Sequence, residues 1–284
     1  MRRITQRIKG IRNIMHITRA MKLVAAARLK RAEERLESAR PYARKMAEVA
    51  LDLAATTPWS FNPLLRPHPY ARRAVVVIFT GDRGLCGGYH ERVVKHALEL
   101  ADELEARQKV SLYAVGQQGL RVLERFRRPV EYRFTESARG VSFETAKKMA
   151  GIIIEQYTQG RCDAVYLIYA KFYSALRQKP RTFQLLPVVP ALAHQRTPEG
   201  LFLFEPSRKE VLDGILARYV ESEIFRAFLE CEAGELGARM TTMANATDNA
   251  GEMIDRLVLD YNRARQAQVT REISEIIGGA EALH

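Results

Sequence analysis

Residues 207–284 constrain the fold more than any other part of the chain, because they contain no proline and carry a long repeating pattern. The pattern alternates steps of four and three, the spacing of a coiled-coil seam, and its members are Leu229, Ala233, Leu236, Met240, Met243, Thr247, Ala250, Ile254, Leu257, Tyr261, Ala264 and Gln268. A capping box at Ser207 and Glu210 precedes it. A helix of this length would extend ~115 Å. The region therefore predicts a coiled-coil helix too long for the interior of a compact domain.

Residues 2–57 predict a second long helix. Apolar residues recur there at steps of three or four, and they are Ile4, Ile8, Ile11, Ile14, Ile17, Met21 and Val24. Pro41 is the one proline in the region, and we expect it to kink or break the helix because proline lacks a backbone N–H.

The charge distribution indicates how these two helices pair. The chain has a formal net charge of +12, with +9 on residues 1–57, +8 on residues 58–206 and −5 on residues 207–284. Two helices that leave one inserted domain pair most simply side by side and antiparallel, and the opposite charges of the two ends favour that arrangement. The overall positive charge also raises the question of an acidic partner: a nucleic acid, an anionic membrane or an acidic protein.

The spacing of apolar residues changes in the middle of the chain. Near-continuous apolar runs at 74–79, 110–115 and 164–169 are typical of strands buried on both faces, and helical stretches at about 90–107, 117–126 and 142–158 alternate with them. This alternation predicts a small Rossmann-like α/β domain with a mainly parallel sheet. The predicted organisation is an N-terminal coiled-coil helix (1–57), a central α/β domain (58–206) and a C-terminal coiled-coil helix (207–284), with the central domain inserted between the paired helices.

The C-terminal helix is expected to be longer than its partner. Residues 270–283 would then project as a single apolar helix, which is marginally stable in water. We therefore expect something outside the chain to enclose this tip.

The sequence offers no convincing active site. The glycine-rich loop at 80–88 follows the first strand, but it matches neither G-x-G-x-x-G nor a P-loop, and no helix is expected to start directly at its third glycine. Cys86 lies beside Arg83 in this loop, yet no histidine is paired with it by spacing. The other two cysteines, Cys162 and Cys231, are too widely spaced for a disulfide framework or a zinc site. We predict no catalytic residue, no cofactor and no metal.

Two further classes are weighed against the charge and hydropathy. The basic N-terminal helix resembles a nucleic-acid-binding segment in charge only, because no aromatic residue precedes Tyr42. No apolar run is long enough to span a membrane, and the first residues lack the core of a signal peptide. We expect a chain that stays on the cytoplasmic side.

Three stretches together resemble the gamma subunit of F-type ATP synthase, and the resemblance extends over essentially the whole chain. They are ITRAMKLVAAA at 17–27, DRGLCGG at 82–88, and ATDNA at 246–250 followed by YNRARQAQVTREI at 261–273. The resemblance implies a non-catalytic rotor shaft. Its coiled coil stands inside a ring of three alpha and three beta subunits, and its α/β domain binds the epsilon subunit and the membrane c-ring. Rotation would couple ion flow to ATP synthesis or hydrolysis and help to regulate ATPase activity.

The resemblance also implies partner contacts. Met21 and Lys22 match the position that faces the moving lever of a beta subunit, and Arg83 lies in the matched loop. The positions that meet the surrounding ring are Arg239, Arg265, Gln266, Thr270 and Glu272.

The chain departs from the family pattern at a few positions. Gly81 stands where the family more often has Ser or Thr, and His90 where it often has Asn. Gly234 and Gly237 lie in the long helix and predict local looseness, at up to ~1 kcal/mol each. The thiol-regulated insertion of the chloroplast form and a transit peptide are both missing, which favours a bacterial origin. The alternatives are a free-standing nucleotide-binding α/β enzyme that uses the loop at 84–88, or a basic coiled-coil nucleic-acid binder.

Overall fold

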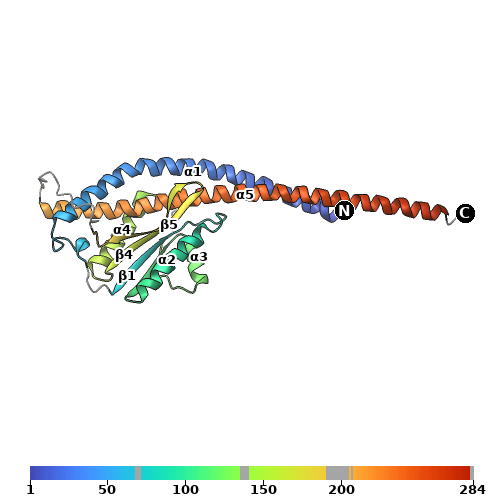
Figure 1. The fold of residues 1–284 in the computed structure, drawn as a ribbon. Helices are drawn as coiled ribbons and strands as arrows, with labels where there is room; N and C mark the ends of the chain where they lie inside the picture. The colour runs from blue at the N-terminus through green and yellow to red at the C-terminus, as the bar shows by residue number, and fades with distance from the viewer. Residues whose placement is uncertain (68–71, 135–140, 190–204, 206, 282–284) are drawn as a thin grey trace. The chain divides into compact units, whose positions relative to one another are not determined.

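The structure is a computed structural model that describes residues 1–67, 72–134, 141–189, 205 and 207–281. The chain divides into two compact units. We call residues 1–26 and 239–284 the coiled-coil unit and residues 27–238 the sheet unit, and each is described by itself. Two long helices contribute to both units, α1 (Arg2–Thr56) and α5 (Arg208–Glu281) (Figure 1).

The sheet unit contains a five-stranded sheet with the order β3-β2-β1-β4-β5. Four strands run parallel and β5 pairs antiparallel with β4 at one edge. The strands are β1 (Arg73–Phe79), β2 (Lys109–Val115), β3 (Tyr132–Phe134), β4 (Ala164–Ser174) and β5 (Arg177–Leu186). The shorter helices are the 3-10 helix η1 (Pro63–Leu65), α2 (Tyr89–Glu105), α3 (Gln117–Arg125) and α4 (Phe143–Thr158).

The predicted strands at 74–79, 110–115 and 164–169 and the three predicted helices are confirmed, with small differences at their ends. The mainly parallel sheet is confirmed as well. β3 and β5 were not predicted, because neither contains an apolar run: β3 has three residues, and β5 alternates exposed and half-buried positions as an edge strand does.

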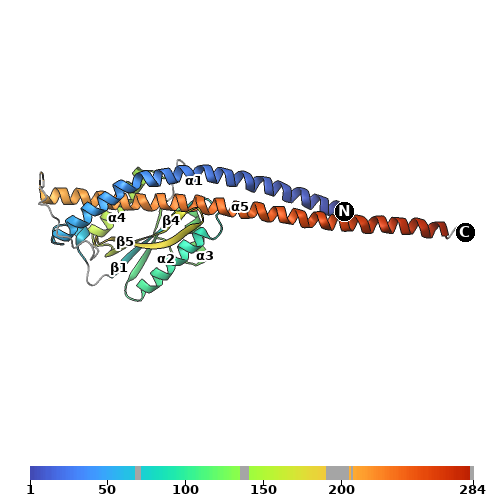
Figure 2. The same cartoon turned by 45° about the horizontal axis from the view of Figure 1, so that its top comes forward.

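Helices cover both faces of the sheet, with α2 and α3 on one side and α5 on the other (Figures 1 and 2). The ring of Phe228 on α5 meets Phe79 at the end of β1 edge to face, with centroids 5.1 Å apart. Phe225 on α5 makes the same kind of contact with Phe143 at the start of α4, at 5.4 Å. α4 therefore shares the α5 side of the sheet, and this part of α5 belongs to the core.

Polar contacts also fix α5 to the ends of the strands. The buried Glu230 carboxylate accepts a hydrogen bond from the Phe172 N–H at 2.6 Å, beside an irregularity in the β4–β5 ladder between Phe172 and Ser174. The Tyr89 hydroxyl donates to the Cys231 carbonyl at 3.1 Å. Both bonds satisfy groups that would be costly to bury alone.

Gly234 and Gly237 do not loosen α5, which continues through both. A Cβ at Gly234 would lie 2.8 Å from the Tyr89 hydroxyl oxygen, and one at Gly237 would lie 3.0 Å from the Cα of Ala175. The expectation of looseness is wrong, because these glycines let the helix backbone closely approach the start of α2 and the turn between β4 and β5.

The antiparallel pairing of α1 and α5 is confirmed within each unit. In the sheet unit, Arg208 donates to the Thr56 carbonyl at 2.8 Å, and Arg35 forms an ion pair with Glu232. In the coiled-coil unit, the hydroxyl oxygens of Thr18 and Thr247 are 2.8 Å apart. Higher residue numbers on α1 are therefore paired with lower residue numbers on α5, as in an antiparallel pair of helices. The Arg35–Glu232 pair joins the basic helix to the acidic one, as the charge distribution predicted.

The predicted seam of α5 is confirmed along the coiled-coil unit. Met243, Ala250 and Leu257 are buried, and the members between them and up to Ala264 are half-buried. Only the last member, Gln268, is exposed.

The predicted stripe of α1 is partly wrong. Ile14, Ile17 and Val24 are each more than half exposed. The inward positions are instead Met15, Thr18 and Ala25, which continue the four-three alternation that begins at Ile4, Ile8 and Ile11. A strict seven-residue repeat keeps a seam on its partner, whereas the three successive steps of three from Ile8 to Ile17 turn the predicted stripe about 100° away from that seam.

Pro41 does not break α1, which is continuous from Arg2 to Thr56. Leu36 and Ala43, on either side of the proline, are both buried. Packing on both sides offsets the one hydrogen bond that proline removes. None of the described helices is long and apolar enough to cross a bilayer.

Candidate functional site

The loop at residues 80–88 follows β1, the strand from which the sheet extends in both directions. β1 pairs with β2 on one side and with β4 on the other. In doubly wound sheets, ligands bind outside the carboxyl ends of the strands at this point of reversal. The geometry of this loop therefore decides whether the chain could be a nucleotide-binding enzyme.

The chain itself occupies the anion-binding end of α3 beside this loop. The Gln117 N–H donates to Asp82 Oδ1 at 2.8 Å, the Gln118 N–H to the Gly81 carbonyl at 3.0 Å, and the Gly119 N–H to Thr80 Oγ1 at 2.9 Å. These are the donors that a helix N-terminus would offer to a phosphate. The loop between β1 and α2 therefore caps the N-terminus of α3, in the place where a phosphate would bind.

Helix α5 occupies the space on the other side of the loop. A Cβ on Gly81 would lie 1.5 Å from Oε2 of the buried Glu235 side chain. The departure from Ser or Thr at this position thus makes room for α5. Helix α2 begins at Tyr89, directly after Gly88, which is closer to the loop than we expected. Gly81 serves packing against α5, Gly87 adopts a positive φ of 59°, and the loop forms no phosphate cradle.

The three cysteines are all buried in the sheet unit. Burial raises the pKa of the Cys162 thiol to about 12, with a smaller contribution from Asp163, so the thiol stays protonated and unreactive near neutral pH. Among the described residues, no group of three His, Cys, Asp or Glu side chains could hold a metal ion. His68, His194 and His284 lie outside the described residues.

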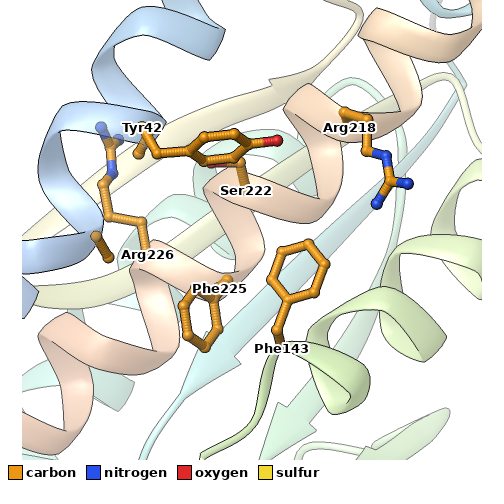
Figure 3. Close-up of a pocket in the computed structure, with 8 residues that line it drawn as sticks. Tyr42, Phe143, Arg218, Ser222, Phe225 and Arg226 are labelled. Atoms are coloured by element: carbon orange, nitrogen blue, oxygen red, sulfur yellow. The ribbon is translucent and has the colours of Figure 1, made fainter. Parts of the chain in front are cut away.

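A pocket of about 370 Å³ lies between α1, α4 and α5 in the sheet unit (Figure 3). Its walls are mostly apolar, and its lining residues are Ala39, Tyr42, Ala43, Phe143, Arg218, Ser222, Phe225 and Arg226. Both guanidinium groups at its edge are paired within α5, Arg218 with Glu221 at 3.1 Å and Arg226 with Glu223 at 2.5 Å. The lining contains no histidine, cysteine or carboxylate that could act as base or nucleophile.

The predicted contact residues fall into three places. Met21 is half-buried and Lys22 exposed on α1, and Arg239 is only 8 % exposed on α5; all three belong to the coiled-coil unit. Arg83 is exposed in the sheet unit, where its carbonyl oxygen lies 3.0 Å from Nε2 of His90.

The other four predicted contact residues lie together near the end of α5. Arg265, Gln266, Thr270 and Glu272 are all exposed, and Glu272 accepts a hydrogen bond from Gln268 at 2.9 Å. Within the coiled-coil unit, α5 continues past the N-terminal end of α1, as Figure 1 shows.

The same segment of α5 exposes apolar side chains. Val269 and Ile273 are about half exposed and Ile276 is 72 % exposed. Their spacing of four and three places them on one face of the helix. The exposed apolar part of this tip is thus as the sequence predicted.

Comparisons with known proteins agree with the resemblance found in the sequence. A family model described as ATP synthase matches residues 1–283. The ATP synthase gamma chain of Heliobacterium modesticaldum is 45% identical over 291 residues, covering 100% of this chain and 99% of the relative. The gamma chain of Desulfitobacterium hafniense is 43% identical, covering 99% of this chain and 98% of the relative.

Solved structures share the fold. A chain from the central stalk and c-ring of the Tetrahymena thermophila mitochondrial ATP synthase matches with a TM-score of 0.62 and 29% identity, covering 81% of this chain and 99% of that chain. A chain of the Euglena gracilis mitochondrial ATP synthase matches with a TM-score of 0.67 at 17% identity, covering 100% of this chain and 94% of that one, and this match bears on the fold alone.

Three observations converge: a loop filled by its own chain, an antiparallel coiled coil, and relatives that match over their full length. The chain therefore belongs to the ATP synthase gamma chain family, the central-stalk subunit of the rotary enzyme, in which other subunits carry the catalytic sites.

Proposed function

We propose that this chain is the rotor shaft of an ion-translocating F-type ATP synthase, and that its rotation couples ion flow to ATP synthesis or hydrolysis. The observation that carries the proposal is the end of α5, which continues beyond α1 and exposes Val269, Ile273 and Ile276. A single helix with an exposed apolar face is marginal in water. Enclosure by a surrounding ring of subunits would stabilise it.

The proposed partners are three alpha and three beta subunits, the epsilon subunit and the c-ring. The Tetrahymena chain with the same fold belongs to a structure of the central stalk and c-ring. The proposed location is the cytoplasmic face of a bacterial membrane, where the chain associates peripherally through these partners. The bacterial gamma chains among its relatives support this location.

The residue roles are proposals as well. Met21 and Lys22 would face the moving lever of a beta subunit, and Arg83 would contact a partner from the sheet unit. The remaining contacts would be made with the surrounding ring, by Arg239, Arg265, Gln266, Thr270 and Glu272. In such a machine the shaft acts through differential contacts that favour one conformation of each catalytic site over another. Catalysis itself needs no side chain of this chain.

The first test is a pull-down of the tagged full chain from detergent-solubilised membranes. We expect alpha, beta and epsilon subunits to co-elute with an ATPase activity that the isolated chain lacks. Elution of the chain alone, or with nucleic acid, would overturn the proposal.

Tip variants sharpen this test. Ile273→Asp combined with Ile276→Asp places two charges on the exposed apolar face, and we expect the co-eluting ATPase activity to fall at least threefold. Phe126→Asp is the matched control, because Phe126 is an exposed apolar residue of the sheet unit. Equal losses from the tip and control variants would speak against an enclosed tip.

A further inference from the structure

The tip of the β4–β5 hairpin carries a concentration of positive charge that the proposed contacts do not use. Residues 164–187 contain four basic residues and no acidic one. Lys171 and Lys179 face each other directly across the two strands. Like charges at opposed positions destabilise a strand pair. The two facing lysines therefore lower the stability of the hairpin.

The ring of Tyr173 contacts two of these basic side chains. The Lys171 ammonium nitrogen and the Arg177 guanidinium carbon each lie 5.1 Å from the centroid of the Tyr173 ring. Cation–π contacts of this kind hold two long side chains near one place. No described carboxylate lies within ion-pair distance of Lys171, Arg177 or Lys179. The cluster is preorganised and faces solvent.

An apolar side chain projects beside the cations. Leu176, at the turn of the hairpin, is 81% exposed, and Tyr173 is 52% exposed. The turn itself is held in place, because Gly237 of α5 packs against Ala175 and Gln178 donates to the Ala175 carbonyl at 2.7 Å. An exposed leucine on a well-anchored turn, with cations around it, has the character of an interface anchor with a charged rim.

The hairpin lies at the same edge of the sheet as the loop at 80–88. β4 runs parallel to β1, so the turn after β4 and the loop after β1 both leave the carboxyl edge. One turn of α5 contacts both, through Glu235 at Gly81 and Gly237 at Ala175. Leu85 in that loop is also mostly exposed and holds a positive φ of 64°. The hairpin therefore extends a surface that already presents an apolar side chain.

We propose that Lys171, Tyr173, Leu176, Arg177 and Lys179 form a docking surface for an acidic protein segment, whose carboxylates meet the cations and whose apolar side chain packs on Leu176. A protein is favoured over a nucleic acid, because Leu176 is 81% exposed and is an aliphatic side chain that can neither stack on a base nor bind a phosphate, and because the Tyr173 ring already lies against two cations of this chain. The two elements that carry the cations are strands of the sheet, so the surface is rigid before the partner arrives.

The test places a photoreactive amino acid at position 176 in the tagged full chain. The complex containing that chain is purified from membranes, irradiated and analysed by mass spectrometry. We expect a cross-link to a partner peptide rich in Asp and Glu. The control carries the same group at Phe126, which is exposed in the sheet unit and lies at the end of α3.

A charge variant provides the second measurement. Lys171→Gln, Arg177→Gln and Lys179→Gln, made together, are expected to lower the yield of that cross-link at least threefold, and raised salt should lower it in the unmodified chain. Glutamine removes the charge but keeps a long polar side chain at each position, and circular dichroism checks that the fold is retained.

Several results would overturn the inference: a cross-link to a neutral or basic peptide, to nucleic acid or to a second copy of this chain, no cross-link at position 176, or a yield unchanged by the charge variant. They are distinguishable from failure of the proposed rotor function, in which no alpha or beta subunit would be present in the purified complex.

Discussion

The two units of this molecule use the same kind of helix in different ways. In the sheet unit, α5 is part of a dense core, and its side chains Phe228, Glu230 and Cys231 are almost fully buried. In the coiled-coil unit, one seam of α5 is covered by α1, while residues such as Leu259 and Ile276 are exposed. A seam on a single partner buries about two positions in seven, whereas a helix against a sheet and another helix is covered over a larger part of its circumference. The sheet unit therefore holds its own structure, and the coiled-coil unit leaves apolar surface for others to cover.

The largest expected contrast is in the energy of a buried aromatic side chain. Phe228→Ala removes a ring that packs edge to face on Phe79, and we expect it to cost about 3–5 kcal/mol of unfolding free energy. Urea unfolding of the full chain followed by circular dichroism measures this. Phe126→Ala, at an exposed position, should change stability by less than about 0.5 kcal/mol. A loss below about 1 kcal/mol for Phe228→Ala would contradict the description of α5 as core in the sheet unit.

Thiol reactivity offers the second contrast. Burial raises the pKa of Cys162 to about 12, against about 8.5 in an unfolded chain. We expect alkylation of Cys162 at pH 8.5, followed by peptide mass spectrometry, to be at least ~100-fold slower in the folded chain than in urea. A cysteine introduced as Ile276→Cys, at the exposed end of α5, should react as fast as in the unfolded state. Equal rates at the two positions would show that the sheet unit opens readily.

The same pKa shift predicts a pH dependence of stability. Because the folded state holds the Cys162 proton more tightly, its contribution to stability is full below about pH 8.5 and is lost as the pH rises from there toward 12. Cys162→Ala should reduce the slope of stability against pH in this range. An unchanged slope would show that other groups account for the loss.

Replacement of glycine by alanine in α5 is expected to change stability in opposite directions in the two units. Gly234→Ala places a Cβ 2.8 Å from the buried Tyr89 hydroxyl and should destabilise the chain by about 1–3 kcal/mol. Gly251→Ala meets nothing within 4 Å and should stabilise α5 by up to ~1 kcal/mol through helix propensity. Thermal unfolding of both variants measures the difference. Stabilisation by both would mean that Tyr89 moves aside at little cost.

The smallest expected effect concerns the polar pair in the coiled-coil seam. Each hydroxyl also lies near a carbonyl of its own helix, at 3.1 Å for Thr18 and 2.7 Å for Thr247. Because each hydroxyl has one proton, one threonine donates to the other and the second donates to its own carbonyl, so Thr18→Val and Thr247→Val should each cost only about 0.5–1.5 kcal/mol. A double-mutant cycle should give a coupling of about 0.5–1 kcal/mol. Thr5→Val, at an exposed position of α1, is the control. A coupling near zero would show that the pair does not define the register.

Much of the fold could be read from patterns that repeat. The seam of α5 repeats over many heptads, so a single misplaced residue could not obscure it, and the three apolar strand runs were equally plain. The short strand β3 and the edge strand β5 carried no such signal. In α1, isoleucines occur on two faces, and sequence alone gave no means to choose between Ile14 and Met15 as the inward position; the contact with α5 decides it.

The candidate site divides in the same way. The exposed apolar end of α5 followed from the longer C-terminal helix, and family resemblance supplied the contact residues that we propose there. The hairpin cluster was missed, although the run of basic residues at 171–181 without an acidic one was a visible signal. What the sequence did not reveal is that Lys171 and Lys179 are opposed, because that depends on the register of two strands.

By itself the sequence determined the two long helices, the inserted α/β domain and membership of a family without catalytic residues, because periodicity and long motifs are properties of the chain read in order. Only the tertiary structure decided the roles of Gly81, Gly234 and Gly237, the inward face of α1 and the capping of α3 by Asp82. These features depend on how closely segments far apart in the chain approach one another, and close approach is set by packing in three dimensions.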